Sequence, residues 1–490
     1  MKALFSLLQR NAFAQLMSLV ANGLAAQDYV TPGQFAYTVE SDIVYGADTN
    51  YLGLIDTLEL DLYKPLGNLD PQRPLLVLAH GGSWLAGCKH DPLGVVPTAI
   101  EFVQRGYVVA SINYRLGWHK AQFVSGNVAG FGISPWPESY RALYALDSAE
   151  IKRAIFRGQQ DMKAAVRFLK ARAALDSVCT DKVFVGGESA GGFVALAAAF
   201  LDRAEERPTA CAAQPDAPEP YSLFLNLTGF DCESHEYTVL PTMRARPDLG
   251  SVEGALNLNG HDARVRGVAN FYGGVPAEAF TQDWWQGTDT PAVYLYHQTC
   301  DGVVMHNQGK PMSIISNYCN LGAAPWHYQY PTMRGSGAIA NAFAGMNSAP
   351  AYHTDFQSCA PFNPDIALID CARYGDNGSY HYVLGRAARC QQLATFWAPI
   401  ASEPGSCLSS SITVDMQHTL VQAVPVPANE AVRFAHANGP ASIVDGAGRV
   451  VLQVADSSLP VDVSALVPGI YIAQIRTRAG LVHARFVVAR

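Results

Sequence analysis

From about Thr57 the sequence alternates between strand-like and helix-like periods, and this alternation restricts the possible folds more than any other feature. Apolar runs at 57–63, 75–80 and 107–113 have strand character, and a helical run at 95–106 precedes the last of them. Parallel strands joined by helices produce such a pattern. The sequence therefore predicts an α/β fold with a mostly parallel sheet.

The alternation continues to about residue 400. The pattern predicts helices at 160–175, from Ser189 onward and at 390–400, and strands at 182–186, 265–274, 291–297 and 326–330. Two stretches lack a clear period and are rich in Gly, aromatic and small polar residues, namely 118–148 and 334–379. We interpret both as inserted loops over a site.

Composition and charge exclude several classes of protein. The 490 residues are 49% hydrophobic and 16% charged, which is enough apolar material for a large core. The net charge is −8, and no run of Lys and Arg could follow a phosphate backbone, so nucleic acid is not an expected partner. The longest apolar segment, which begins at Ala190, has the length of a buried helix, so no membrane span is expected.

The cysteines suggest an oxidising environment. There are ten, without a CxxC pair or a Cys/His cluster at zinc-ligand spacing, which favours disulfides over a metal site. Scattered buried thiols are the alternative. The last six fall as sequence neighbours that would close short loops worth roughly 3 kcal/mol each, although spacing leaves the connectivity open: Cys300 and Cys319, Cys359 and Cys371, Cys390 and Cys407.

Residues 1–27 have the layout of a cleaved export signal. Lys2 and Arg10 precede an apolar stretch at 12–20, and small residues follow it. Two polar residues interrupt the apolar stretch, so an ordinary amphipathic helix is the alternative. Export would agree with the cysteine pattern, because disulfides persist outside the cytosol.

A second domain is expected after the closing helix. Residues 412–490 contain no cysteine and no lysine, and they consist of short runs with alternating apolar and polar residues separated by turn signals. We expect a small β-sandwich over 412–490, and a main α/β domain over 28–405.

The sharpest local motif is G-x-S-x-G, formed by Gly187, Ser189 and Gly191 between a predicted strand and a predicted helix. Glycines two residues before and after the serine allow a sharp turn that exposes its hydroxyl above the strand ends. The helix that follows directs its N-terminus at the reacting oxygen. Ser189 is therefore a candidate nucleophile, and a helix N-cap is the alternative.

A second motif, H-G-G-S-W, begins at His80 directly after an apolar strand. Small residues at this place let backbone N–H groups face a carbonyl oxygen on which negative charge develops, and each such donor is worth roughly 3 to 4 kcal/mol. We expect the donors to be Gly82, Ser83 and Ala190. An ordinary Gly-Gly turn is the alternative, and it would leave the partnership with G-x-S-x-G unexplained.

A serine nucleophile needs a base and an orienting acid, which follow it in the order acid, then histidine, in this topology. Asp301 comes after the predicted strand 291–297, where a loop at the carboxyl end of a strand can hold a carboxylate. His381 lies shortly before the closing helix. These two residues are the candidate acid and base.

The long stretch before His381 leaves other assignments open. His353 is the alternative base. Asp365, Asp370 and Asp376 are the alternative acids.

With these motifs in order, residues 40–400 resemble the α/β-hydrolase superfamily, in particular carboxylesterases with an HGG-type oxyanion loop, close to acetyl and feruloyl esterases and the hormone-sensitive-lipase type. The resemblance implies a serine carboxylesterase without a metal or organic cofactor. Ser83 replaces the third glycine of the family's usual motif, which preserves the backbone amide and narrows the acyl side of the site.

The last 75 or so residues resemble the type A sorting domain of the type IX secretion system of Bacteroidetes-like bacteria. The carrying segments are PVPANEAVRF, IVDGAGRVV, VDVSALVPGIYIAQI and the terminal RFVVAR. This resemblance implies passage through the periplasm, recognition by the secretion machinery, and release or attachment at the cell surface.

The sequence thus predicts a secreted serine esterase whose first-choice substrates are acetyl or feruloyl esters of plant polysaccharides. A peptidase of the prolyl oligopeptidase type shares the triad order, and a non-catalytic binding protein on a hydrolase scaffold is a rival of another class. Five tryptophans could build an aromatic cleft for a sugar or feruloyl ring, or belong to ordinary packing: Trp84, Trp118, Trp136, Trp284 and Trp285.

Overall fold

The structure is a computed structural model. It describes residues 27–120, 145–218, 244–277, 290–319, 326–403 and 407, followed by 423–424, 428, 430–434, 439–445, 450–477 and 480–489. The expected export signal lies outside the described residues except for Gln27. The chain divides into two compact units, Met1–Cys407 and Leu408–Arg490.

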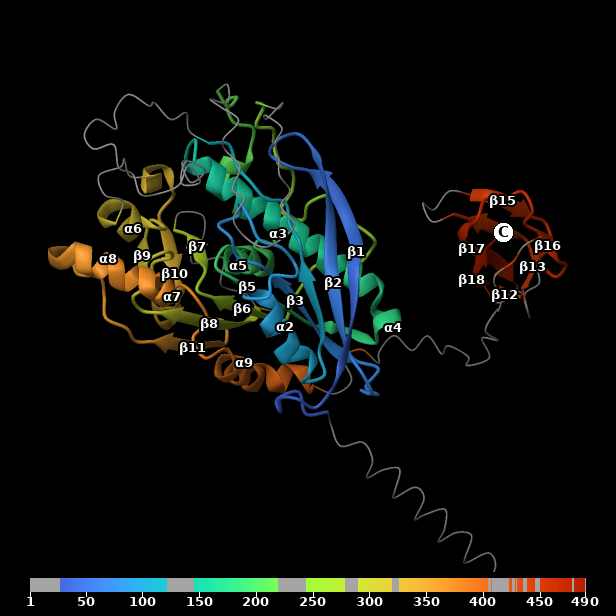
Figure 1. The fold of residues 1–490 in the computed structure, drawn as a ribbon, viewed down its shortest axis with the longest axis horizontal. Helices are drawn as coiled ribbons and strands as arrows, with labels where there is room; N and C mark the ends of the chain where they lie inside the picture. Colours follow the sequence, from blue (N-terminus) through green and yellow to red (C-terminus); the bar gives the residue numbers. More distant parts are fainter. Residues whose placement is uncertain are drawn as a thin grey trace, which may run out of the picture. The chain divides into compact units, whose positions relative to one another are not determined.

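The first unit is built on an eight-stranded sheet with the order β1-β2-β4-β3-β5-β6-β8-β11 (Figure 1). Its first two strands pair antiparallel with each other, and β2 pairs antiparallel with β4. From β4 to β11 every pairing is parallel. The strands are β1 (Tyr37–Thr49), β2 (Ile55–Pro65), β3 (Arg73–Ala79), β4 (Val108–Ile112), β5 (Val178–Glu188), β6 (Gly267–Phe271), β8 (Ala292–Gln298) and β11 (Tyr352–Gln357).

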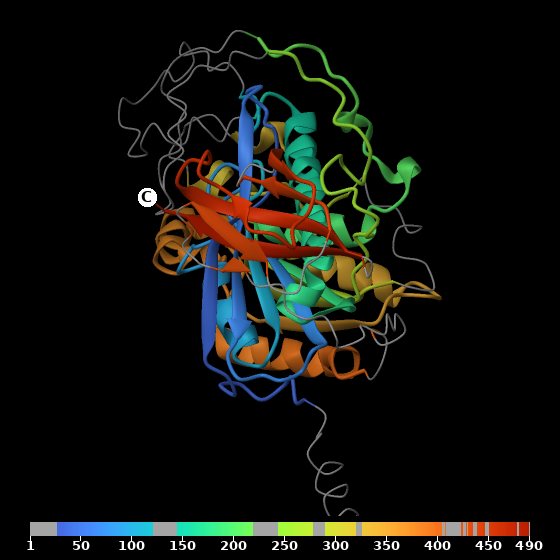
Figure 2. The ribbon, with the colours of Figure 1, turned by 90° about the vertical axis from the view of Figure 1, so that its right-hand side faces the viewer.

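Helices cover both faces of this sheet (Figure 1, Figure 2). One apolar cluster packs α3 (Ser148–Ala171) and α5 (Ala190–Phe200) against the sheet, and a second packs α2 (Val95–Val103) and α9 (Arg386–Ala401). The central strands are buried along their whole length, which explains their continuous apolar sequences. The predicted α/β class and its mostly parallel sheet are confirmed.

Shorter elements complete the first unit. The strands β7 (Gly274–Pro276), β10 (Met333–Gly335) and β9 (Gln308–Gly309) form a small antiparallel sheet. The remaining helices are α4 (Ala173–Asp176), α6 (Ser313–Tyr318), α7 (Ser336–Ala344) and α8 (Ala367–Asp376), with 3-10 turns at Ala204–Glu206, Thr209–Cys211, Trp326–Gln329, Pro364–Ile366 and Gly378–Tyr380. None of the described helices combines the length and apolarity needed to cross a bilayer.

Two expectations about secondary structure are wrong. Most of the predicted strand at 326–330 is a 3-10 turn, Trp326–Gln329, and the buried residues His327 and Tyr330 are three positions apart, as a helical period requires. The supposed loop at 334–379 contains α7, α8 and the edge strand β11. The helices of this segment are rich in small residues and its edge strand is polar, so none of these elements shows a clear apolar period in the sequence. Most of the other supposed loop, 118–148, lies outside the described residues.

Disulfides join distant parts of the first unit. Cys179 pairs with Cys407, Cys300 with Cys359, and Cys319 with Cys371. Cys88 also takes part in a disulfide, whereas Cys211 and Cys390 are buried free thiols. The expected pairing of sequence neighbours is therefore wrong, although the expectation of disulfides is supported.

The topology explains one of these pairings. Cys300 and Cys359 follow β8 and β11, which run parallel and adjacent, so the sheet brings their carboxyl ends together. Sequence spacing carries no information about such a contact between strands that are far apart in the chain.

The second unit consists of antiparallel strands, as its alternating sequence predicts. Described strands form a three-stranded sheet, β12-β13-β16, and a four-stranded sheet, β15-β14-β17-β18. Their bounds are β12 (Ala423–Val424), β13 (Ala431–Phe434), β14 (Ala441–Val444), β15 (Val450–Val454), β16 (Val461–Asp462), β17 (Gly469–Thr477) and β18 (Gly480–Val488). One buried apolar cluster includes Val432, Ile443, Ile475 and Phe486.

Candidate active site

Ser189 occupies a sharp turn between β5 and α5. Its φ of 54° and ψ of −120° lie in a region that residues with a side chain rarely adopt. The flanking glycines make the turn possible: a Cβ on Gly187 would lie 2.2 Å from Gly191 O, and one on Gly191 would lie 2.1 Å from Ala79 O. At both glycine positions, neighbouring backbone atoms occupy the space that a side chain would need. The sharp turn at the carboxyl edge of the sheet therefore requires glycine before and after Ser189.

Ser189, His381 and Asp301 form one continuous chain of contacts. Ser189 Oγ lies 2.7 Å from His381 Nε2, and His381 Nδ1 lies 2.8 Å from Asp301 Oδ2. In this arrangement the hydroxyl donates to Nε2 and the Nδ1–H donates to the carboxylate. The structure therefore brings the three predicted residues together in the predicted order.

Two loops hold the histidine in place. The carbonyl oxygen of Ser379 accepts a hydrogen bond from Gly302 N–H at 2.9 Å, and that of Tyr380 accepts one from the Gln298 side chain at 3.0 Å. The segment before His381 is thereby fastened to the loop that carries Asp301. Ser379 and Tyr380 both have positive φ values, 54° and 57°, so the backbone takes a strained path to present the imidazole.

Asp301 is fully partnered although its side chain is buried. Its Oδ1 accepts the backbone N–H groups of Val303 and Val304 at 2.8 and 2.9 Å. Its Oδ2 faces His381 and also His297, whose Nε2 lies 3.3 Å away. Burial alone would raise the pKa of Asp301, but the two imidazoles outweigh burial and hold this pKa below its usual value. Asp301 is therefore available as an ionised acceptor at neutral pH.

His297 was not among the predicted residues, yet it contacts the same oxygen of Asp301 as His381 does. His297 is completely buried, and its Nε2 also donates to Val304 O at 2.9 Å. Its Nδ1 faces Ser336 Oγ at 3.0 Å, and Ser336 in turn accepts a hydrogen bond from Asn270 Nδ2 at 3.1 Å. The spacing of His297 and Asp301, four residues apart at the end of one strand, was the available signal.

The H-G-G-S-W loop lies directly beside the serine. A Cβ on Gly81 would lie 3.2 Å from Ser189 Cβ, and Trp84 Nε1 donates to Ala190 O at 3.1 Å. Gly82, Ser83 and Trp84 have consecutive positive φ values of 106°, 56° and 57°. This unusual path turns the loop back across the start of α5.

The predicted donors are unengaged in the described part of the chain. The backbone N–H groups of Gly82, Ser83 and Ala190 donate no hydrogen bond to another described residue. Three such groups next to a reactive hydroxyl are what a developing oxyanion requires.

His80, the first residue of this loop, packs in the core. Its ring stacks on Tyr114 with centroids 4.5 Å apart, and Nδ1 lies 2.7 Å from Gly81 O. Burial lowers the pKa of His80 to about 4, so the ring is neutral at physiological pH. A neutral imidazole packed in the core shapes the loop and does not titrate with the site.

Glu188, the residue before the serine, connects the two halves of the site. It is buried, accepts a hydrogen bond from Tyr272 Oη at 2.6 Å, and forms an ion pair with Arg386 at the start of α9. Although burial would lower the pKa of Arg386, Glu188 reverses this effect and raises it. The Tyr272 ring meets the His381 ring edge-on, with centroids 4.6 Å apart. Tyr272 and Arg386 were not among the predicted residues, because both are remote in sequence from Glu188.

The alternative base and acids are engaged elsewhere. His353 lies on β11, where its Nε2 is 3.2 Å from Gln392 Oε1. Asp370 pairs with Arg373 at 2.9 Å, Asp365 lies in an exposed 3-10 turn, and Asp376 is exposed at the end of α8. None of these four side chains contacts Ser189 or His381, so the geometry favours the first-choice assignment.

The predicted aromatic cleft receives no support from the described tryptophans. Trp84 and Trp118 are buried in the core, where Trp84 packs edge-on against Phe193. Trp136, Trp284 and Trp285 lie outside the described residues. Core packing is therefore the role of the two tryptophans that the structure describes.

The arrangement has the parts that acyl transfer needs. It provides a hydroxyl against a basic nitrogen, a carboxylate that orients the imidazole, and unengaged backbone donors beside the reacting oxygen. Within the described ranges, no group of three or more His, Cys, Asp or Glu side chains is arranged to hold a metal ion.

The chain is similar to known esterase-type proteins. A family model described as BD-FAE matches residues 60–125, a segment that contains β3, β4 and the H-G-G-S-W loop. Esterase 2 of Thermogutta terrifontis phosphorylated by paraoxon is 15% identical, with a TM-score of 0.34 over 69% of this chain and 92% of that chain. The propionate-bound form of that Thermogutta terrifontis esterase is 18% identical, with a TM-score of 0.33 over 69% and 93%.

A truncated form of a carbohydrate esterase from gut microbiota is 14% identical, with a TM-score of 0.38 over 76% of this chain and 98% of that chain. No curated protein matches the chain.

Proposed function

We propose that the chain is a serine carboxylesterase that works through an acyl-enzyme. The observation that carries this proposal is the unbroken series of contacts from Ser189 through His381 to the buried carboxylate of Asp301, next to unengaged backbone donors. The match of residues 60–125 to BD-FAE, an esterase-like α/β-hydrolase domain, supports the same reaction class.

In the acylation step, Ser189 Oγ attacks the ester carbonyl carbon while His381 Nε2 takes the hydroxyl proton. The carbonyl oxygen becomes an oxyanion, which the N–H groups of Gly82, Ser83 and Ala190 stabilise by roughly 3 to 4 kcal/mol each. Collapse of the intermediate breaks the ester C–O bond, and His381 returns the proton to the departing alkoxide. Asp301 keeps the imidazole oriented and stabilises its positive charge.

In the deacylation step, water replaces the alcohol. His381 takes a proton from water, whose oxygen attacks the acyl carbon, and the same donors hold the second oxyanion. The carboxylic acid leaves when the bond to Ser189 Oγ breaks, and the proton returns to this oxygen. The balance is one ester and one water to one acid and one alcohol, and this chain's residues supply every proton transfer.

For the natural ester we propose acetyl or feruloyl groups on plant polysaccharides. The H-G-G-S-W and G-x-S-x-G motifs and their order support this class through their resemblance to acetyl and feruloyl esterases. A panel of acetylated xylan, methyl ferulate and aryl esters of increasing chain length tests it. Hydrolysis of aryl acetates without activity on the polysaccharide or ferulate would leave the mechanism standing and reject the substrate class.

The mechanism has its own test. The protein should hydrolyse 4-nitrophenyl acetate, and a fluorophosphonate should add one phosphonyl group per chain as Ser189 Oγ displaces fluoride. Ser189→Ala should lose several orders of magnitude in kcat and all labelling, while circular dichroism stays unchanged. Unlabelled wild-type protein, or a label retained in Ser189→Ala, would reject the serine mechanism. Cleavage of prolyl peptides without cleavage of esters would favour the peptidase alternative.

We further propose that the protein is exported through the periplasm and that the second unit addresses it to the secretion machinery. Disulfides in the first unit and antiparallel sheets in the second support this proposal. The segments that resemble type A sorting domains indicate the type IX secretion system as the expected machinery.

A further inference from the structure

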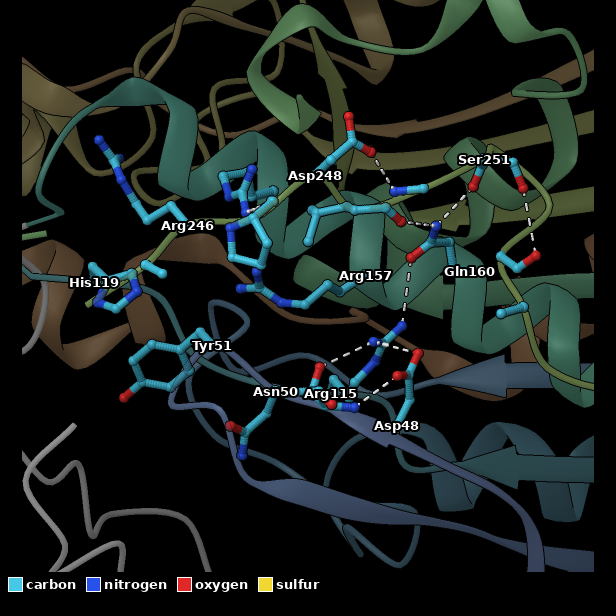
Figure 3. Close-up of a pocket in the computed structure, with 18 residues that line it drawn as sticks. Asp48, Asn50, Tyr51, Arg115, His119, Arg157, Gln160, Arg246, Asp248 and Ser251 are labelled. Atoms are coloured by element: carbon cyan, nitrogen blue, oxygen red, sulfur yellow. Dashed lines mark hydrogen bonds and ion pairs between the residues drawn. The ribbon is translucent and has the colours of Figure 1, made fainter. Parts of the chain in front are cut away.

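The first unit contains a cavity that takes no part in the proposed reaction. Its volume is about 380 Å³, and it lies between the first half of α3, the turn after β1, and the segments 115–119 and 245–255 (Figure 3). None of the described residues that line it belongs to the candidate active site. A volume of this size is in the range that holds small ligands.

Arginine is the outstanding residue type in the lining. Four guanidinium groups line this arginine cavity, namely Arg115, Arg153, Arg157 and Arg246. Two of them are neutralised: Arg115 pairs with Asp161 and Asp48, and Arg246 pairs with Asp147 and Glu150. Arg153 donates hydrogen bonds to three backbone carbonyl oxygens.

Arg157 is the exception among the four. It is 3% exposed, and its Nη2 donates to Gly117 O at 2.6 Å. Its Nε is buried without a hydrogen-bond partner, and no carboxylate among the described residues forms an ion pair with it. Burial lowers the pKa of Arg157 to about 10, which leaves the group charged at neutral pH. A buried charge with an unmet donor is unfavourable unless another group satisfies it.

The space in front of Arg157 contains a second unengaged polar group. The guanidinium extends from α3 toward His119 and Tyr51 (Figure 3). The His119 ring packs edge-on against Tyr51 with centroids 5.5 Å apart, and its two ring nitrogens form no hydrogen bond or ion pair with a described residue. Burial lowers the pKa of His119, so a neutral imidazole that donates one N–H faces the cavity at neutral pH.

No carboxylate that lines the cavity forms an ion pair with Arg157, although Glu150 and Asp161 act on its charge without pairing with it. The carboxylates that line the cavity are Asp48, which pairs with Arg115, and Asp248, which pairs with Arg207 and lies more than half exposed. Arg157 thus lines the cavity with an unmet Nε–H donor and without an ion pair to a described carboxylate, and a planar guanidinium matches two oxygens of a carboxylate or phosphate.

We propose that the arginine cavity is a binding site for a small anion, in which Arg157 holds a carboxylate or phosphate group and His119 donates a further hydrogen bond. The proposal does not depend on ester hydrolysis. A carboxylate would come from a uronic acid or a related sugar acid, and a phosphate from inorganic phosphate or a phosphate ester.

Calorimetric titration of the full-length protein tests this site. The probes are sodium phosphate and sodium galacturonate at constant ionic strength, with sodium chloride as the reference titrant. At least one probe should bind saturably, with a dissociation constant in the millimolar range or below. Binding of phosphate alone or galacturonate alone identifies the source of the oxyanion, and binding of both supports the shared chemistry. No saturable binding of either probe would overturn the proposal.

Variants locate the binding. Arg157→Gln should weaken the bound probe at least tenfold, and His119→Gln should weaken it several-fold without a loss of folding, since the ring nitrogens bond to no described residue. Arg264→Gln, at a guanidinium that is 77% exposed, is the control and should bind as wild type does. Ser189→Ala should also bind normally, which separates this site from the reaction.

Two results would overturn the assignment of the residues. One is unchanged affinity in Arg157→Gln. The other, decisive if Arg157→Gln does not fold, is unchanged affinity in His119→Gln.

Discussion

The candidate active site and the arginine cavity both bury charged side chains, yet they satisfy these charges differently. At the active site, Asp301 has donors on both oxygens and His381 has a partner at each nitrogen. In the arginine cavity, Arg157 keeps an unpaired buried Nε. The first cluster is complete without a ligand, whereas the second is not.

This difference teaches how each cluster should respond to change. In a complete network, removing one member leaves its buried partner unsatisfied, so the loss exceeds one hydrogen bond. In an incomplete cluster, removing the unsatisfied member relieves an unfavourable burial. Substitutions in the two regions should therefore have different consequences.

The largest expected effect is in the hydrogen-bonded network of Ser189, His381 and Asp301. His381→Ala should lower kcat for 4-nitrophenyl acetate by about 10⁴-fold or more, because the serine loses its base and Asp301 loses its charge partner. His353→Ala is the matched control and should cost far less, since that ring lies on β11 and contacts Gln392 instead of Ser189 or Asp301. If His353→Ala proves the more damaging change, the base has been misassigned.

The same comparison explains what the sequence could predict. The serine turn and the oxyanion loop are local, so glycine spacing beside a strand was sufficient to find Ser189, Gly82 and Ser83. Asp301 and His381 followed from chain order. Their proximity is now described, while their catalytic roles stay predictions.

Residues that act across long separations could not be found in this way. Glu188 and Arg386 are 198 positions apart, and Arg157 meets Gly117 from a different element. No periodicity connects such pairs, because only the packing of helices on the sheet brings them together. The connectivity of the disulfides was missed for the same reason.

A second prediction compares two arginines of the cavity. Arg115→Leu should destabilise the fold by about 3 to 5 kcal/mol, because it leaves the buried carboxylate of Asp161 without its charged partner. Arg157→Leu should cost less, about 1 to 2 kcal/mol in buffer without phosphate or carboxylates, because it leaves the buried carbonyl oxygen of Gly117 without its donor but leaves no carboxylate without an ion-pair partner. Urea unfolding measures both. Equal losses would show that Arg157 is as fully compensated as Arg115, contrary to the proposed difference.

A third prediction concerns the connection between the serine turn and the histidine loop. Glu188→Gln keeps an acceptor for Tyr272 but removes the charge that neutralises Arg386, and kcat should fall by roughly 10- to 100-fold with little change in KM. Glu253→Gln is the control and should leave kcat unchanged, because this half-exposed carboxylate pairs with Lys163 and Arg167, neither of which belongs to the candidate active site.

A purely structural role for Glu188 would give a different result. The remaining folded fraction would then show normal kcat at low temperature. The double variant Glu188→Gln/Arg386→Gln should recover part of the lost stability, because the uncompensated cation is removed together with its partner.

The smallest expected effect on catalysis comes from the second unit. Residues 412–490 contribute none of the side chains of the active site or the arginine cavity, and both clusters belong to the unit Met1–Cys407. A chain that ends at Ser411 retains Cys407 and therefore its disulfide to Cys179. It should keep esterase activity within a few-fold, and the same anion affinity, when produced in a foreign host.

In the native host it should stay in the periplasm, whereas the full chain reaches the surface or the medium. Cell fractionation with an activity assay tests both parts. Normal export of the shortened chain would reject the sorting role, and export without activity would mean that the β-unit supports the catalytic architecture.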